Sequence, residues 1–200
     1  ARAFTSAARS DEDLATLRGW LDDTGIPAGL TVDTELRWSV LAALVANGAA
    51  GAAEIEAELA GDRTASGERE AAYAQALLPT AENKAALWAL LTGPDALPNW
   101  RHRALLQGFA HPTQVELIAP YRERYFETVA QVWATRDSEP AQEFAQLAYP
   151  AYLVEDDTVA ATDAWLAGDG HPAPLRRLVA EGRDGVLRAL KARAKDAQSA

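Results

Sequence analysis

The sequence predicts an all-α fold, and three observations support the prediction. Alanine is the commonest of the 200 residues, and it favours helix over other backbone conformations. Residues that cap helices, followed by apolar residues three and four positions apart, recur along the whole chain. No segment alternates β-branched and polar residues over the four or five positions that a half-buried strand requires.

The first half of the chain is expected to hold five helices, four of them opened by a residue that can cap it. Ser10 shows the pattern clearly, because three acidic residues and then leucines at helical spacing follow it. Glycine or proline ends each span. The expected spans are Ser10–Gly25, Asp33–Gly48, a short helix around Ile55–Gly61, a helix from Thr64 or Ser66 to Pro79, and Thr80–Gly93.

The second half is expected to hold six more helices, and proline sets several of their ends. Proline fits the first turn of a helix, where its missing N–H is not needed, and interrupts a helix elsewhere. Two glycines, Gly182 and Gly185, predict a bend or break in the last helix. The expected spans are Asn99–Phe109 with Asn99 as its cap, Pro112–Pro120, Tyr121–Trp133, Ser138–Pro150, Asp156 or Asp157 to Gly168, and Pro174 into the tail.

Short helices joined by tight turns predict antiparallel helix pairs. Such pairs, stacked side by side, make an α-solenoid of the HEAT or armadillo kind. No repeat consensus is visible, so we expect an irregular superhelix. Two hundred residues suit one domain or one elongated array, and residues 1–200 are therefore expected to form a single helical-repeat domain.

Charge and composition disfavour several classes of function. The net charge of −10 makes nucleic acid and anionic membrane surfaces unlikely partners, since both would repel the chain. No apolar run is long enough to span a bilayer, and the chain has no Cys for disulfides or thiolate metal sites. The first residues lack the apolar core of a signal peptide, so a cytoplasmic location is expected. With no Met at position 1, the chain is expected to be processed or part of a longer one.

Aromatic residues are concentrated between Gly108 and Trp133. They could line a ligand site or form the packing face of a helix. On a helical wheel that starts at Tyr121, one arc of roughly 140° collects the apolar side chains. Because such a helix must bury this stripe, packing is the favoured interpretation. The stripe consists of Tyr125, Phe126, Val129, Val132 and Trp133.

Three arginines interrupt apolar faces. Arg122 and Arg101 either lay their stems on apolar neighbours, with their charges in water, or point into a partly enclosed concave space. For Arg37 a structural ion pair with Asp33 is expected, because Asp33 lies four residues earlier on the same helix.

The sequence offers no constellation for catalysis or metal binding. His102, His111 and His171 lack H-E-x-x-H and any partner at metal-ligand spacing, and the last two precede prolines, where turn roles are expected. Neither a G-x-S-x-G elbow nor a Gly-rich phosphate loop occurs. The acidic pairs at Asp22 and Asp156 are explained by capping. We therefore expect no catalytic residue, metal site or cofactor in this chain.

Several stretches, taken in order, resemble the C-terminal helical domain of aminopeptidase N. This is the gluzincin family of zinc aminopeptidases, in its actinobacterial branch. The ordered set covers most of the chain and is more specific than any one stretch. The stretches are GLTVDTELRW (Gly29–Trp38), IEAELAGDRTASG (Ile55–Gly67), the aromatic segment (Gly108–Trp133), SEPAQEFAQLAYP (Ser138–Pro150) and PLRRLVAEGRDGVLRALKAR (Pro174–Arg193).

The resemblance implies a non-catalytic part of a larger enzyme. In that family, a separate thermolysin-like domain carries H-E-x-x-H, the zinc ligands, G-x-M-E-N and a transition-state Tyr, and none of these motifs occurs here. The family's C-terminal domain is a curved α-solenoid that closes over the active-site cleft and forms the peptide chamber. The implied partners are the catalytic domain of the same polypeptide and peptide substrates, with zinc in the parent enzyme.

In some members this domain also contacts the substrate's carboxyl end. Arginine and tyrosine side chains suit such a carboxylate, so Arg122, Arg101 and Tyr121 are the candidates here. Two alternatives remain open: a stand-alone helical-repeat scaffold for a protein partner, and a small α-helical enzyme of its own.

Overall fold

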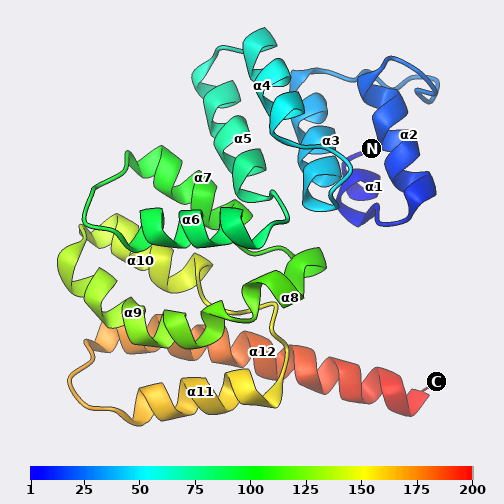
Figure 1. Ribbon diagram of the computed structural model, residues 1–200. Helices are drawn as coiled ribbons and strands as arrows, with labels where there is room; N and C mark the ends of the chain where they lie inside the picture. Colours follow the sequence, from blue (N-terminus) through cyan, green and yellow to red (C-terminus); the bar gives the residue numbers. More distant parts are fainter. Residues whose placement is uncertain (200) are drawn as a thin grey trace.

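The computed structural model describes residues 1–199, and every regular element within them is helical (Figure 1). The all-α prediction is confirmed. The first six helices are α1 Arg2–Ala7, α2 Asp11–Leu21, α3 Thr34–Ala46, α4 Ala52–Gly61, α5 Ala65–Ala76 and α6 Ala81–Thr92. The rest are α7 Asn99–Phe109, the 3-10 turn η1 Pro112–Gln114, α8 Val115–Ile118, α9 Tyr121–Thr135, α10 Ser138–Leu147, α11 Asp156–Ala167 and α12 Ala173–Ser199.

Four predicted caps are confirmed, because each side chain accepts a hydrogen bond from the backbone three residues later. Ser10 accepts from the Asp13 N–H, and the Asp13 carboxylate in turn accepts from the Ser10 N–H. Asp33, Thr64 and Thr80 cap α3, α5 and α6 in the same way. The local sequence therefore sets where these helices begin.

Other helix starts differ from the sequence expectation. The short helix α1 was not expected, and no side chain caps it. Pro98, not Asn99, is the N-cap of α7, and Asn99 is the first helical residue. Its amide is used elsewhere, since it donates to Glu139 on α10. Likewise, Glu155 precedes α11, so Asp156 lies inside the first turn.

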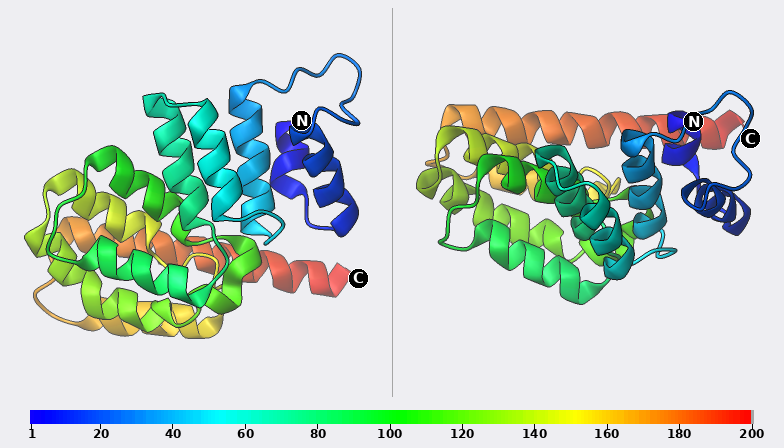
Figure 2. Two further views of the ribbon diagram at one scale, coloured as in Figure 1. Left: turned by 45° about the horizontal axis from the view of Figure 1, so that its top comes forward. Right: turned by 90° about the horizontal axis from the view of Figure 1, so that it is seen from above.

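The break expected near Gly182 and Gly185 is wrong. Helix α12 runs unbroken for 27 residues, and Figure 2 shows its C-terminal end extending past α9, α10 and α11. Gly182 allows a close approach: a Cβ there would lie 2.7 Å from the Tyr149 ring. Gly185 has no such neighbour, its nearest atom being Arg188 Nη2 at 4.0 Å. Close packing against the Tyr149 ring therefore explains why a glycine occupies position 182.

The contacts between helices divide them into three groups: α5, α7, α10 and α12; α6, α9 and α11; and α1 to α4 (Figures 1 and 2). Helices α5, α7, α10 and α12 contact one another in succession, so they form one layer. Next to this layer, α6 packs against α7, α9 packs against α10, and α11 packs against α12. Helices α1 to α4 continue the array at the other end, where α3 and α4 both contact α5.

Two hydrophobic clusters make up the core. The first joins α1 to α5 and includes Leu17, Trp38 and Ile55. The second joins α5 to α12 and includes the aromatic stripe of α9. Tyr73 on α5 packs against both clusters, so α5 is the helix that connects them.

The aromatic stripe of α9 is core, as predicted. Tyr125 is fully buried, its hydroxyl donates to the Ala145 carbonyl at 2.6 Å, and its ring stacks on Phe144. Tyr121 and Val129 are also buried, whereas Phe126 and Trp133 are partly buried at the edge of the cluster.

Helices α5 and α7 cross unusually closely at Gly108. A Cβ at Gly108 would lie 2.5 Å from the Tyr73 carbonyl oxygen and 2.7 Å from Ala76 Cβ. The last carbonyls of both helices meet there. The buried Lys84 ammonium donates to Ala76 O at 2.7 Å and to Gly108 O at 3.4 Å. This cation therefore satisfies carbonyls that a helix end leaves unpaired and complements both helix dipoles.

The end of α3 is attached at the same place. The buried Gln114 amide donates to Ala46 O of α3 at 2.9 Å and to Leu77 O, directly after α5, at 2.7 Å. We name Lys84, Gln114 and the carbonyls that they bind the carbonyl junction. It links the C-terminal ends of three helices.

The two glycines of α12 give a matched prediction. Gly182→Ala should lower the free energy of unfolding by about 1–3 kcal/mol, because the new methyl group would overlap the buried Tyr149 ring, whose hydroxyl is hydrogen-bonded to Thr162. Gly185→Ala should leave it unchanged or raise it by up to about 1 kcal/mol, as alanine favours helix. Urea unfolding of both variants checks this, and equal effects would contradict it.

The carbonyl junction predicts a pH dependence of stability. Burial lowers the pKa of Lys84 to about 8. An unfolded lysine keeps its proton to about pH 10.4, so between these values the unfolded chain binds more protons and raising the pH stabilises the fold.

The unfolding free energy of the wild type relative to Lys84→Met should therefore rise by about 2 kcal/mol from pH 8 to pH 10. Urea titrations at several pH values measure it, and Lys191→Met on the exposed end of α12 is the control. A difference that does not change with pH would rule the effect out.

Candidate functional site

Three adjoining hollows cross α1, α3, α5, α7 and α10, and we name them together the cross-helix groove. Neighbouring hollows share lining residues: Glu70 and Tyr73 belong to the first two, Arg69 and Gln107 to the last two. The first hollow also includes Arg2, Arg9, Ser39 and His111. The last includes Asn99, Trp100, Arg103, Glu139 and Glu143.

Helical periodicity places these side chains in rows. On α5, residues 69, 70 and 73 recur at three- and four-residue spacing, with Leu77 directly after the helix, and residues 100, 103, 104 and 107 do so on α7. Residues at these spacings share one face of a helix. Because α5 and α7 lie side by side, the two rows form a continuous lining.

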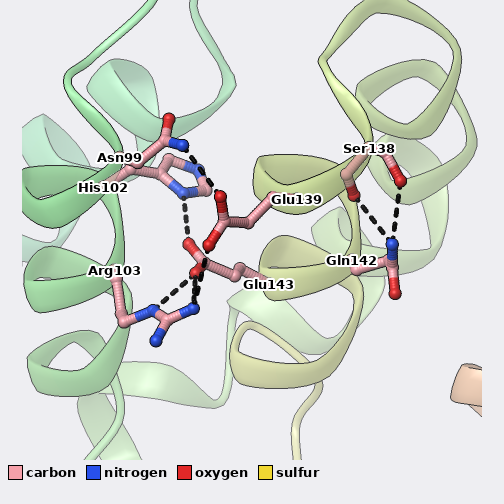
Figure 3. A network of polar contacts seen from close by, with 7 residues as sticks. All are labelled: Asn99, His102, Arg103, Ser138, Glu139, Gln142 and Glu143. Atoms are coloured by element: carbon pink, nitrogen blue, oxygen red, sulfur yellow. Dashed lines mark hydrogen bonds and ion pairs between the residues drawn. The ribbon is translucent and has the colours of Figure 1, made fainter.

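A polar network closes the groove between α7 and α10 (Figure 3). Arg103 Nε donates to Glu143 Oε1 at 2.5 Å, and His102 Nδ1 lies 3.3 Å from Glu143 Oε2. Asn99 and Arg103 both contact Glu139, at 2.9 and 3.3 Å. The network ties the two helices together.

The geometry of this network suits holding α7 and α10 together better than it suits proton transfer. His102 is buried, and burial lowers its pKa although Glu143 opposes that effect. A neutral imidazole is therefore favoured at neutral pH. Its Nε2 is buried without a hydrogen-bond partner in the described residues, so no proton relay continues beyond it.

The groove carries two arginines that pair with no carboxylate in residues 1–199. The Arg9 guanidinium donates to Ala8 O and Ser6 O, and that of Arg69 donates to Ser66 Oγ. By contrast, Arg103 is neutralised by Glu143 and Glu139. Arg9 and Arg69 are therefore the groove cations available to an anionic group.

The remaining histidines have the turn roles expected of them. His111 is the N-cap of η1 and accepts from the Thr113 N–H, and burial lowers its pKa to about 4. His171 lies just before α12 and stacks on Trp165 with ring centroids 3.8 Å apart. Within residues 1–199, no three His, Asp or Glu side chains are grouped as a metal site would require.

Comparison with known proteins identifies the domain. Residues 1–188 match the family described as the ERAP1-like C-terminal domain. The chain belongs to this family. Over all 200 residues it is 49% identical to aminopeptidase N of Streptomyces lividans, and it spans 23% of the length of that protein. The predicted family resemblance is thereby confirmed.

The three arginine and tyrosine candidates are not brought together in this ERAP1-like domain. Arg122 Nη1 pairs with Glu155 at 3.0 Å, and its Nη2 lies 3.9 Å from Asp157. The Tyr121 ring is buried against Trp88 and Phe109.

Arg101 lies exposed on α7, beside Trp100 of the groove. In residues 1–199 no hydrogen bond or ion pair joins Arg101 to Arg122 or Tyr121. None of the three lines the described groove hollows.

The predicted ion pair between Asp33 and Arg37 is replaced by another. Arg37 makes a bidentate pair with Glu58 on α4, at 2.7 and 2.8 Å, and also donates to Leu21 O. The Asp33 carboxylate is occupied by the Leu36 N–H that it caps. Capping and pairing compete for the same carboxylate, and a better partner for Arg37 lies on the neighbouring helix.

Sequence reasoning missed the groove residues. Polar residues and an aromatic at three- and four-residue spacing on α5 and α7 were a usable signal. They resemble any solvated helix face, however, until the two helices are placed side by side. Separately, no helix in the described part of the chain has the length and apolar character of a membrane span.

The network between α7 and α10 predicts unequal roles for its two glutamates. Glu143→Ala should lower the free energy of unfolding by about 2–3 kcal/mol, because it leaves buried His102 without its carboxylate partner and leaves Arg103 with Glu139 alone. Glu139→Ala, one turn away and exposed, should cost about 0–1 kcal/mol. Thermal and urea unfolding compare the two, and similar losses would contradict the assignment.

Proposed function

We propose that this chain is the non-catalytic C-terminal domain of a zinc aminopeptidase N. The parent enzyme would hydrolyse N-terminal residues from peptides in a catalytic domain outside this chain. The observation that carries the proposal is the 49% identity to an aminopeptidase N over the whole chain, which accounts for only 23% of that relative. Zinc would belong to the parent enzyme, and a cytoplasmic location is part of the proposal.

The arrangement of the helices supports a role as a chamber wall. We infer that residues 1–200 form one irregular α-solenoid of HEAT-like, antiparallel pairs, because α5, α7, α10 and α12 contact one another in succession. A solenoid binds its partner along an extended face. The cross-helix groove runs over this layer, so it is the face proposed to close the active-site cleft and enclose the peptide.

A direct test uses the complete polypeptide that contains this domain. Loaded with zinc, it should hydrolyse an aminoacyl amide, whereas the 200-residue chain alone should give no turnover. Activity of the isolated chain would overturn the proposal and support an enzyme of its own kind.

Contact with the peptide's carboxyl end stays a prediction for Arg122, Arg101 and Tyr121. For Arg122, a substrate carboxylate must displace Glu155. Arg69 and Arg9 need no such exchange, because neither pairs with a carboxylate in the described residues. We therefore extend the proposal to these two groove arginines.

Arg122→Ala and Arg69→Ala in the complete enzyme separate the two locations. The variant that removes the carboxylate contact should raise KM for a peptide about three- to tenfold, leaving KM for a one-residue chromogenic amide unchanged. Arg177→Ala, which removes an exposed pair with Glu181 on α12, is the control. Equal effects on peptide and amide would discard the contact for that arginine.

A further inference from the structure

Glu70 stands apart from the other shielded carboxylates of the domain. Within residues 1–199, six Asp or Glu side chains are buried or half-buried. Five of them accept hydrogen bonds or ion pairs: Asp13, Glu54, Glu58, Asp62 and Glu143. Glu70 has neither a hydrogen bond nor an ion pair in this part of the chain.

None of the charged side chains near Glu70 in the described residues forms an ion pair or hydrogen bond with it. Arg69 is adjacent in sequence, and consecutive residues on a helix point in different directions. Its guanidinium is turned to Ser66. Arg2 is paired with Glu35, and Arg9 donates to backbone carbonyls. Burial raises the pKa of Glu70, with Arg69 opposing this effect and Glu35 adding to it.

A half-buried carboxylate without a partner is unfavourable, because part of its hydration is lost and no hydrogen bond in the described residues replaces it. The position of Glu70 indicates what could replace it. Glu70 lines both the first and the second hollow of the groove together with Tyr73, which lies three residues later on α5. An incoming cation would meet the carboxylate beside an aromatic ring, which attracts cations as well.

We propose that Glu70 is a specificity-determining residue that receives the Lys or Arg side chain of a bound peptide. This inference rests on the proposed function, since it places peptide in the groove. The cation supplies the charged partner that Glu70 lacks, and its alkyl stem packs on Tyr73. Peptides with a basic residue at the matching distance from the N-terminus are therefore preferred substrates of the parent enzyme.

The test uses the complete aminopeptidase and peptides that differ at one position. Lys, norleucine or Glu is placed in turn at each position beyond the fourth, and kcat/KM is measured. Glu70→Gln should lower kcat/KM for the best Lys peptide about five- to tenfold and change the norleucine peptide less than twofold. Glu70→Lys should reverse the order, so that the Glu peptide becomes the better substrate.

Glu68→Gln is the matched control, because Glu68 lies on the same helix but lines a different hollow, with Glu56 and Leu59 of α4. It should leave all three peptides unchanged. Hydrolysis of a one-residue amide and the Tm of each variant check folding. If Glu70→Lys does not fold, the near-isosteric Glu70→Gln decides alone.

Two failures are distinguishable. If Glu70→Gln lowers kcat/KM equally for the Lys and norleucine peptides, Glu70 does not distinguish charged from neutral side chains. This inference is then wrong, but the proposal that the groove encloses peptide still stands. If Glu70→Gln, Arg69→Ala and Arg103→Ala all leave every peptide unchanged, peptide does not enter the groove, and the proposed function of this face fails with it.

Discussion

The close crossing of α5 and α7 is the constraint on which the rest of the domain depends. Gly108 lets the two backbones approach, because any side chain there would meet the α5 backbone. Close approach brings two helix C-terminal ends together, and their unpaired carbonyls and dipoles then need a cation. Lys84 supplies it from α6. The two hydrophobic clusters, each sharing Tyr73, are joined at this crossing.

The groove follows from the same geometry. Its lining rows belong to α5 and α7, so their separation sets how far Tyr73 and Gln107 stand apart. At the far end, the buried Glu143 carboxylate contacts His102 and Arg103 and holds α10 against α7. A rigid lining keeps charged groups in fixed positions, which the proposed contact with a peptide would require. The buried polar groups of the domain thus position helices, whereas within residues 1–199 Arg9 and Arg69 pair with no carboxylate and Glu70 pairs with no cation in the groove.

Local sequence predicted the elements well and the site poorly. Ser10, Asp33, Thr64 and Thr80 begin their helices as expected, because a cap acts through a backbone N–H three residues away. The apolar stripe of α9 was also predicted correctly, because the spacing of its residues depends on one helix alone. Asn99 and Asp33 show where local prediction fails. Each polar side chain can make only a few hydrogen bonds, and for Asn99 the partner is Glu139 on a neighbouring helix.

The sequence by itself determined that the chain is all-helical, where most helices begin, and which family it belongs to, because these depend on local bonding and on residue order. Only the tertiary structure decided that Arg37 pairs with Glu58, that Gly182 packs on Tyr149 rather than breaking α12, and that residues of α1, α3, α5, α7 and α10 line one groove. These outcomes depend on contacts between residues far apart in the chain. No local pattern encodes such contacts, since the partner is defined by packing and not by spacing.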